Sequence, residues 1–310
     1  MSKLILPINT IPPIKIYNHH AFGTGIVTTI PEGMNWIYNN YILISYYPDE
    51  GPLTFDYYMD YIYCQPVFDR ESISDELLAV MKWDAVKLFV EAIKQNKYVI
   101  TCVDEFYIPQ REAYENFHFI HNIIIYGFDT DEKRFYTAGY DEHGKYTAQT
   151  ITYKELQRSK PRKITFLRFR SDLDYEIEPE YIKQQLFQYN GTVKLNPVGS
   201  YPREGRLVGV DAVNGLMDYI KLSIDAHTAI DIRPVQLLHE HRTIMKQRIE
   251  KLIAMGSFSD DILSEYIDQA KQCDILCKRV MLYNLRQSGK DAEAVTELTE
   301  KFYNLSLPIG

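Results

Sequence analysis

The stretch that decides the fold runs from Val103 to Asp129 and reads VDEFYIPQREAYENFHFIHNIIIYGFD. It ends in a run of isoleucines that is typical of a buried strand, and His121 stands at the start of that run. A titratable ring at the mouth of a strand sits on a rigid element and can still reach a cleft, as a general base must. Structural hydrogen bonds would explain His118 and His121 as well, so the pattern alone leaves both interpretations open.

The sequence around this stretch predicts a mixed α+β half. Runs rich in Ile, Val, Thr, Tyr and Phe predict strands at 98–108, 121–128, 134–140, 146–153 and 163–169. Polar turn signals separate them, and such short connections favour an antiparallel meander. Upstream, apolar residues recur at spacings of three and four from about Ser74 to Gln95. This spacing predicts one amphipathic helix with Ser74 as its N-cap.

The second half is predicted to be almost entirely helical. Helices are expected at about 179–190, 207–225, 233–255, 259–287 and 291–304, with a loop rich in Gly and Pro at 191–206. The pattern changes in the polar stretch between Arg170 and Pro179. We therefore expect an α+β domain over residues 1–172 and an all-helical domain over 173–310.

Charge and hydropathy exclude several classes of function. The chain has 310 residues and a net charge of −8, with no dense Lys/Arg stripe, which argues against a nucleic-acid partner. No apolar run is long enough to span a membrane, and the first residues do not form a signal peptide. We therefore expect no membrane partner and a cytoplasmic location. Neither the Walker nor the Rossmann glycine pattern is present, so no nucleotide cofactor is expected.

The four cysteines are too few for a disulfide scaffold in a chain of this length. Cys273 and Cys277 share one face of a predicted helix, but no further ligands lie near them, so core packing is favoured over a metal site. Cys102 lies inside a predicted strand, where burial would keep its thiol unreactive. Cys64 precedes a Gln-Pro turn and is expected to be more exposed.

One further cluster of polar residues lies at a predicted helix start: Asp231, Arg233, His239, His241 and Arg242. Asp231 is a plausible N-cap followed by a charged first turn. The alternative is an anion-recognising patch, for example for the phosphopantetheine of a carrier protein.

The chain resembles the family of butirosin biosynthesis protein H. The residues that carry the resemblance are Val103–Asp104, Tyr107–Pro109, Tyr114, His118–His121, Ile124–Asp129 and Gly144–Tyr146, with a looser match over 229–252. That family is similar to papain-like cysteine peptidases that process bacteriocin leader peptides. The resemblance therefore implies a papain-like domain with a mainly antiparallel sheet over residues 1–172. The family's namesake moves an acyl group from a carrier-protein thioester onto an amine of an aminoglycoside.

The resemblance implies a cysteine nucleophile at the start of the first helix, a histidine base and an orienting acid on the next strand. His121 matches the base. By the same match Asp104, Tyr107, Tyr114 and His118 would line the cleft and bind substrate. Implied partners are an acylated carrier protein or peptide intermediate and a small amine acceptor, with no metal.

The sequence departs from this pattern at two places. Residues 17–36 contain no cysteine, and the region of the nucleophile, residues 20–22, begins with His20. The family's acid aligns with Gly139; Asp141, two residues on, is the expected orienter, although a turn would also use it. Thr24, between two glycines, is a candidate hydroxyl nucleophile. Turn chemistry explains those glycines equally well.

Two functions follow from the resemblance and the departures. The first is an acyltransferase, or a related thioester- or amide-processing enzyme of bacterial natural-product biosynthesis. In it His121, with His20, would act as base without a cysteine acyl-enzyme. The alternative is a non-catalytic papain-like protein that binds a peptide or carrier-linked intermediate. The side chain that faces His121 should discriminate between them. A thiol or hydroxyl favours covalent catalysis, whereas an apolar residue or a second histidine favours binding or direct transfer.

Overall fold

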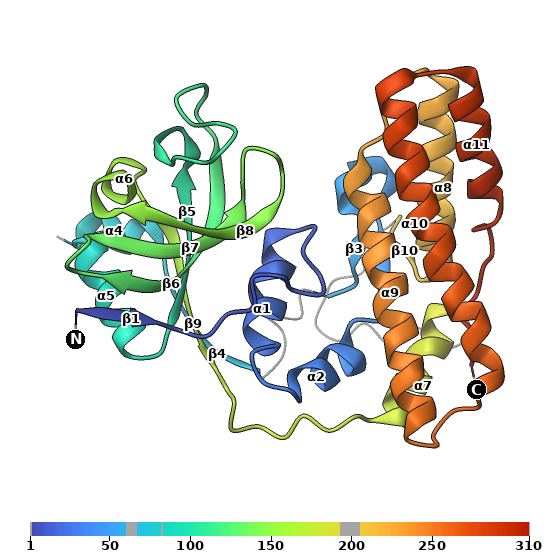
Figure 1. Cartoon of the computed structure of the whole chain (residues 1–310), viewed down its shortest axis with the longest axis horizontal. Helices are drawn as coiled ribbons and strands as arrows, with labels where there is room; N and C mark the ends of the chain where they lie inside the picture. Colours follow the sequence, from blue (N-terminus) through green and yellow to red (C-terminus); the bar gives the residue numbers. More distant parts are fainter. Residues whose placement is uncertain (1, 60–66, 82, 193–204, 310) are drawn as a thin grey trace. The chain divides into compact units, whose positions relative to one another are not determined.

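A computed structural model describes residues 2–59, 67–81, 83–192 and 205–309, and it divides the chain into two compact units (Figure 1). The first unit combines residues 1–34 with 61–174, and the second combines 35–60 with 175–310. The sequence predicted a single boundary between residues 172 and 173. One boundary lies close to that position, but segment 35–60 belongs to the helical unit.

The first unit is built on an antiparallel sheet in the order β4-β9-β5-β6-β7-β8, with β1 pairing to β6. The strands are β1 (Lys3–Ile5), β4 (Phe68–Ile73), β5 (Tyr98–Asp104), β6 (Ile120–Asp129), β7 (Arg134–Tyr140), β8 (Tyr146–Thr152) and β9 (Arg162–Phe169). The predicted meander is present as β6, β7 and β8. The mixed architecture and the antiparallel sheet are confirmed, whereas β1 and β4 were not predicted.

The single helix predicted over 74–95 was wrong, because the structure has two helices there. Ser74 caps α4 (Asp75–Val80), and its Oγ accepts the N–H of Leu77. The backbone at Met81 is extended, and Asp84 then caps α5 (Ala85–Lys94) by accepting the N–H of Lys87 at 3.0 Å. The apolar periodicity runs through both helices, so it does not reveal the second cap.

Helix α1 (Asn18–Val27) is almost entirely buried, and its glycines allow the chain to approach closely. A Cβ on Gly25 would lie 2.8 Å from the carbonyl oxygen of Asn9. The N–H of Asn9 donates to the carbonyl of Gly25 at 2.8 Å, which ties the helix to the chain before it. Close backbone packing therefore explains this glycine. α6 (Tyr153–Arg158) follows β8 and opens with a capping box on Thr152.

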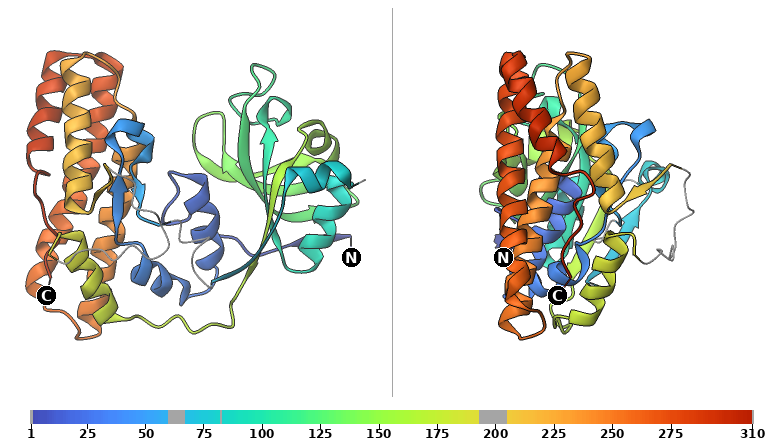
Figure 2. Two further views of the ribbon diagram at one scale, coloured as in Figure 1. Left: turned by 180° about the vertical axis from the view of Figure 1, so that it is seen from behind. Right: turned by 90° about the vertical axis from the view of Figure 1, so that its right-hand side faces the viewer.

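The second unit contains α7 (Pro179–Tyr189), α8 (Val210–Asp225), α9 (Ile232–Ala254), α10 (Leu263–Arg286) and α11 (Gly289–Glu300). α8 to α11 run alongside one another in both ribbon views (Figure 2). A small antiparallel sheet joins β10 (Leu207–Val208), β2 (Ile44–Tyr46) and β3 (Asp56–Tyr57). The helical C-terminal region is confirmed. Within the described ranges, no helix combines the length and apolar character of a membrane span.

Two buried hydrogen-bond donors, Arg248 and His241, hold segment 35–60 against α9. Arg248 donates to the carbonyls of Tyr38 and Tyr41, at the end of α2 (Gly33–Asn40), the second of these at 2.7 Å. His241 Nε2 donates to the carbonyl of Ile42 at 2.7 Å. Both side chains are fully buried. Carbonyls at a helix C-terminus have no partner within the helix, and a guanidinium satisfies them well.

These contacts also decide between the two interpretations of the polar cluster at the start of α9. Asp231 is the N-cap, and its Oδ1 accepts the N–H of Arg233 at 3.0 Å. Arg242 is fully buried and donates to the hydroxyl of Tyr189 at 2.9 Å. Since His241 and Arg242 are buried, the surface patch expected for an anion does not form.

His241 should make the stability of the helical unit sensitive to acid. Burial, with Arg242 and Arg248, lowers its pKa well below the usual value, against the opposing bond to Ile42. Below about pH 6.5 only the unfolded chain takes up this proton, so the free energy of unfolding falls as pH drops, by at most about 1.4 kcal/mol per pH unit. His241→Gln keeps a donor for Ile42 and should reduce this slope.

Urea denaturation at pH 7.5, 6 and 5 would measure this effect. His143, whose side chain is 81% exposed, provides the control His143→Gln. An unchanged slope in His241→Gln would contradict the assignment.

Candidate functional site

The candidate site of the first unit is centred on His121, which lies on β6 opposite Val103 of β5. Its side chain is 33% exposed. Nδ1 lies 3.1 Å from Glu105 Oε1, and Nε2 lies 3.2 Å from Asn18 Nδ2. The imidazole is therefore held at both nitrogens, by a carboxylate on one side and an amide on the other.

Glu105 is the residue that sequence reasoning missed. It begins the 3₁₀ turn η3 (Glu105–Tyr107) immediately after β5, and its side chain is only 7% exposed. β5 ends at Asp104, so the alternation of side chains along a strand does not determine where Glu105 points. The sequence predicted a strand over 98–108, so it gave no sign that β5 ends four residues earlier.

Arg111 accompanies this carboxylate. Its Nε lies 3.7 Å from Glu105 Oε1, its side chain is 1% exposed, and its Nη1 donates to the carbonyl of Tyr140. Burial lowers the pKa of Arg111, and the negative charge of Glu105 opposes that shift. A carboxylate and a guanidinium that are both buried compensate each other electrostatically, whereas either alone would be costly.

The position of Arg111 explains Gly139. A Cβ on residue 139 would lie 2.6 Å from both Nη1 and Nη2 of Arg111, which is closer than real contacts allow. The resemblance placed the family's orienting acid at this position. In this chain the guanidinium occupies that space, and Glu105 contacts Nδ1 of His121 instead. The position of Arg111 therefore explains both the glycine at 139 and the absence of an acid there.

Asp141 lies in the turn between β7 and β8. Its Oδ1 accepts the N–H groups of His143 at 2.9 Å and of Lys145 at 2.8 Å. Burial raises the pKa of Asp141, but these hydrogen bonds outweigh it, and the net pKa is lowered. These contacts belong to a turn residue, the alternative that the sequence left open.

Asp104 and His118 form a second pair near His121. Asp104 Oδ2 lies 2.7 Å from His118 Nδ1, and its Oδ1 accepts the N–H groups of Phe106 and Phe119. Burial raises the pKa of Asp104, but the bonds from His118 and the backbone dominate and lower it. The His118 side chain is 64% exposed and its ring stacks on Phe106. Asp104 therefore caps the backbone of this segment.

The predicted cleft residues Tyr107 and Tyr114 lie in the same segment, between β5 and β6. Arg158 lies over the Tyr107 ring at 4.9 Å, and Tyr114 is 37% exposed. The Phe119 ring lies 5.2 Å from that of His121 and is 45% exposed. Phe119 is therefore the aromatic side chain shown beside the imidazole, and Tyr107 contacts Arg158.

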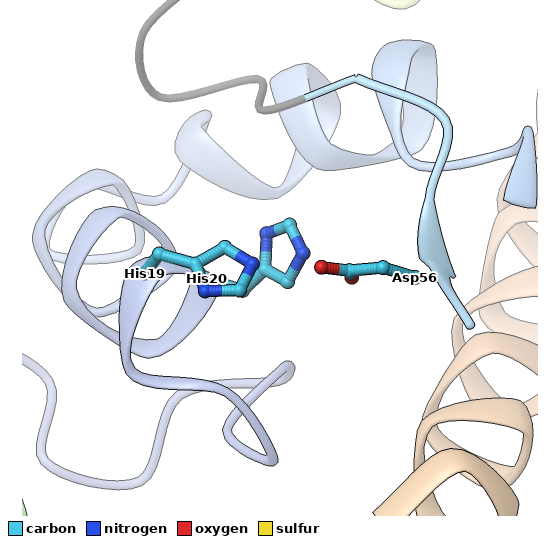
Figure 3. A group of neighbouring side chains, drawn as sticks. All are labelled: His19, His20 and Asp56. Carbon is cyan, nitrogen blue, oxygen red and sulfur yellow. The ribbon is translucent and has the colours of Figure 1, made fainter. Parts of the chain in front are cut away.

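The residue that α1 brings to His121 is Asn18, not the predicted His20. Residues two apart on a helix point to different sides, so the two side chains cannot approach one partner together. His20 is 1% exposed, and its ring centroid lies 4.2 Å from that of His19 (Figure 3). The third residue drawn there, Asp56, begins β3 of the other unit.

The other candidate nucleophiles are engaged away from His121. Cys102 pairs with Asn122 across the sheet and so lies on the opposite face from His121, with Sγ 2.8 Å from Asn122 Oδ1. Thr24 is fully buried, and its hydroxyl donates to the carbonyl of His20 at 2.8 Å. Burial raises the thiol pKa of Cys273 and Cys277 in α10, that of Cys277 to about 12. Cys64 lies outside the described residues.

The chain matches no protein-family model and no curated protein. The resemblance to the family of butirosin biosynthesis protein H therefore stays an expectation from the residues quoted above.

Gly139→Ala should destabilise the first unit, because the new methyl group would displace the Arg111 guanidinium from its buried position. Overpacking of this kind costs about 1–3 kcal/mol. Gly289→Ala is the control, because its Cβ would meet open space. Chemical denaturation of both variants tests this, and equal stabilities would contradict the contact.

Cys102 should react slowly with iodoacetamide at neutral pH. Burial raises the pKa of its thiol, against the opposing charges of Lys163 and Arg162. Peptide mapping by mass spectrometry should show slower labelling in the folded chain than in urea. Equal rates in the two states would show that this thiol is accessible and activated.

Proposed function

We propose that this chain is an acyltransferase, or a related thioester-processing enzyme, in which His121 acts as a general base without a covalent acyl-enzyme. One observation carries the proposal. The imidazole has a buried carboxylate at Nδ1 and an amide, not a thiol or hydroxyl, at Nε2. The arrangement provides an oriented base but no nucleophile at that base.

In the proposed reaction an acceptor amine attacks the carbonyl carbon of a thioester. His121 Nε2 removes a proton from the amine as the new C–N bond forms, and Glu105 stabilises the resulting imidazolium. The C–S bond then breaks, and the departing sulfur takes up the proton from Nε2. General base catalysis contributes roughly 10²–10⁴ and positioning of both substrates adds more. Because a thioester is already activated, this route needs no enzyme nucleophile.

The substrate classes come from the resemblance. The acyl donor would be an acylated carrier protein, and the acceptor would be a small amine of bacterial natural-product biosynthesis. The partly exposed Phe119 ring beside His121 would provide a surface for the acyl group. Asp104, Tyr107, Tyr114 and His118 would contribute to binding from the segment between β5 and β6.

A second candidate, a non-catalytic cleft for a peptide or carrier-linked intermediate, is favoured by Asn18. This residue is 6% exposed and directs its amide at the nitrogen that a catalytic base would use. A papain-like protein that had lost its nucleophile could keep the cleft for binding alone.

His121→Ala should lower the rate of acyl transfer by about 10²–10⁴, the contribution of a general base. Glu105→Gln should cause a comparable loss, because an amide lacks the negative charge that stabilises the imidazolium formed in the reaction. The assay would follow thiol release from acylated carrier proteins in the presence of aminoglycosides or diamines. His143→Gln is a matched control on an exposed histidine.

Initial rates should show a ternary-complex pattern, and intact mass should show no acyl adduct on the protein. Parallel ping-pong lines with a trapped adduct would overturn the direct route. Binding of the acylated carrier protein without thiol release, unchanged in His121→Ala, would support the non-catalytic cleft.

A further inference from the structure

Asn18, the first residue of α1, makes two hydrogen bonds through one nitrogen. Its Nδ2 lies 3.0 Å from the backbone carbonyl oxygen of Asn122 and 3.2 Å from His121 Nε2. Asn18 is 6% exposed, so these bonds form away from solvent. The amide therefore links the helix to two successive residues of β6.

The carbonyl of Asn122 determines which way the amide faces. The oxygen and nitrogen of an asparagine amide are assigned from their hydrogen-bond partners. A backbone carbonyl only accepts, so the atom 3.0 Å from it must be the nitrogen. Asn122 pairs with Cys102 in the sheet, and the position of its carbonyl is set by that pairing. The orientation of Asn18 is thus fixed by the backbone.

The same nitrogen determines the tautomer of His121. Nδ2 of Asn18 carries only hydrogens toward its partners, so Nε2 of His121 must accept and carry no proton. The proton of the neutral ring then lies on Nδ1, where Glu105 Oε1 accepts it at 3.1 Å. A proton on Nε2 would face the N–H of Asn18 directly. One helix residue therefore excludes both the other tautomer and the imidazolium while the contact lasts.

We infer that Asn18 is a positioning residue that holds His121 in the neutral tautomer with a bare Nε2, and that residue 18 marks where a nucleophile meets the base. A group that replaces the Asn18 amide at Nε2 must itself donate a hydrogen bond. This selects amines, hydroxyls and thiols over carboxylates and phosphates. The Oδ1 of Asn18 is buried with no hydrogen-bond partner among the described residues. A primary amine has enough hydrogens to donate both to Nε2 of His121 and to this oxygen.

The inference that an amine meets Nε2 rests on the proposed function. The inference about the tautomer of His121 rests on the hydrogen bonds of Asn18 alone. Nitrogen-15 NMR of the full chain with labelled histidine reports the protonation of each ring nitrogen, and His121→Gln identifies the signals of His121. We expect Nδ1 protonated and Nε2 bare in the wild-type protein. In Asn18→Asp the carboxylate accepts at this position while Glu105 still accepts at Nδ1, so Nε2 should become protonated. A proton on Nε2 in the wild type, or no change in Asn18→Asp, would overturn the inference.

A second measurement covers the case in which Asn18→Asp fails to fold. Asn18→Cys places a thiol beside Nε2, which should take its proton, so that the sulfur displaces iodide from iodoacetamide rapidly. The double variant Asn18→Cys with His121→Gln is the control and should react at least tenfold more slowly. Equal rates would overturn the placement of residue 18. Both measurements need no substrate, so a failed acyl-transfer assay would refute the proposed function alone.

Discussion

The buried carboxylate of Glu105 is the constraint on which the candidate site depends. It lies at a point where the chain leaves β5, nearly out of contact with water, and there its charge must be compensated. Arg111 provides the compensating charge, and the imidazole of His121 provides a hydrogen bond. Arg111 in turn needs the space above Gly139. The carboxylate of Glu105 thus accounts for the glycine at 139, the buried Arg111 and the orientation of the His121 imidazole.

The resemblance implies an orienting acid on the strand after the histidine, whereas Glu105 contacts Nδ1 of His121 from the turn that follows β5. Arg111 lies close to Gly139, the position that aligns with the implied acid. At Nε2 of His121, Asn18 presents an amide and not the implied thiol. Under the proposed function, this arrangement favours proton transfer over covalent catalysis.

Buried polar side chains also fix the backbone in the helical unit, where they have a structural role. Arg248 and His241 are fully buried, and they donate to backbone carbonyls at and after the end of α2. These bonds satisfy acceptors that the short helix leaves open. They explain why residues 35–60 belong to a unit otherwise formed by the C-terminal half. A prediction with one domain boundary could not place residues 35–60 in the same unit as the C-terminal half.

The sequence by itself determined the elements whose causes are local. Runs rich in β-branched and aromatic residues predicted β5 to β9, and helical apolar patterns predicted α7 to α11. The turn at Asp141 was among the alternatives. The tertiary structure decided the partners. Asn18 and His121 are 103 residues apart, and Glu105 is 16 residues from His121. Asp84 divides a predicted helix by a cap that periodicity cannot show. Hydrophobic periodicity records which face of an element is buried, but it carries no information about which polar atoms meet when two elements pack.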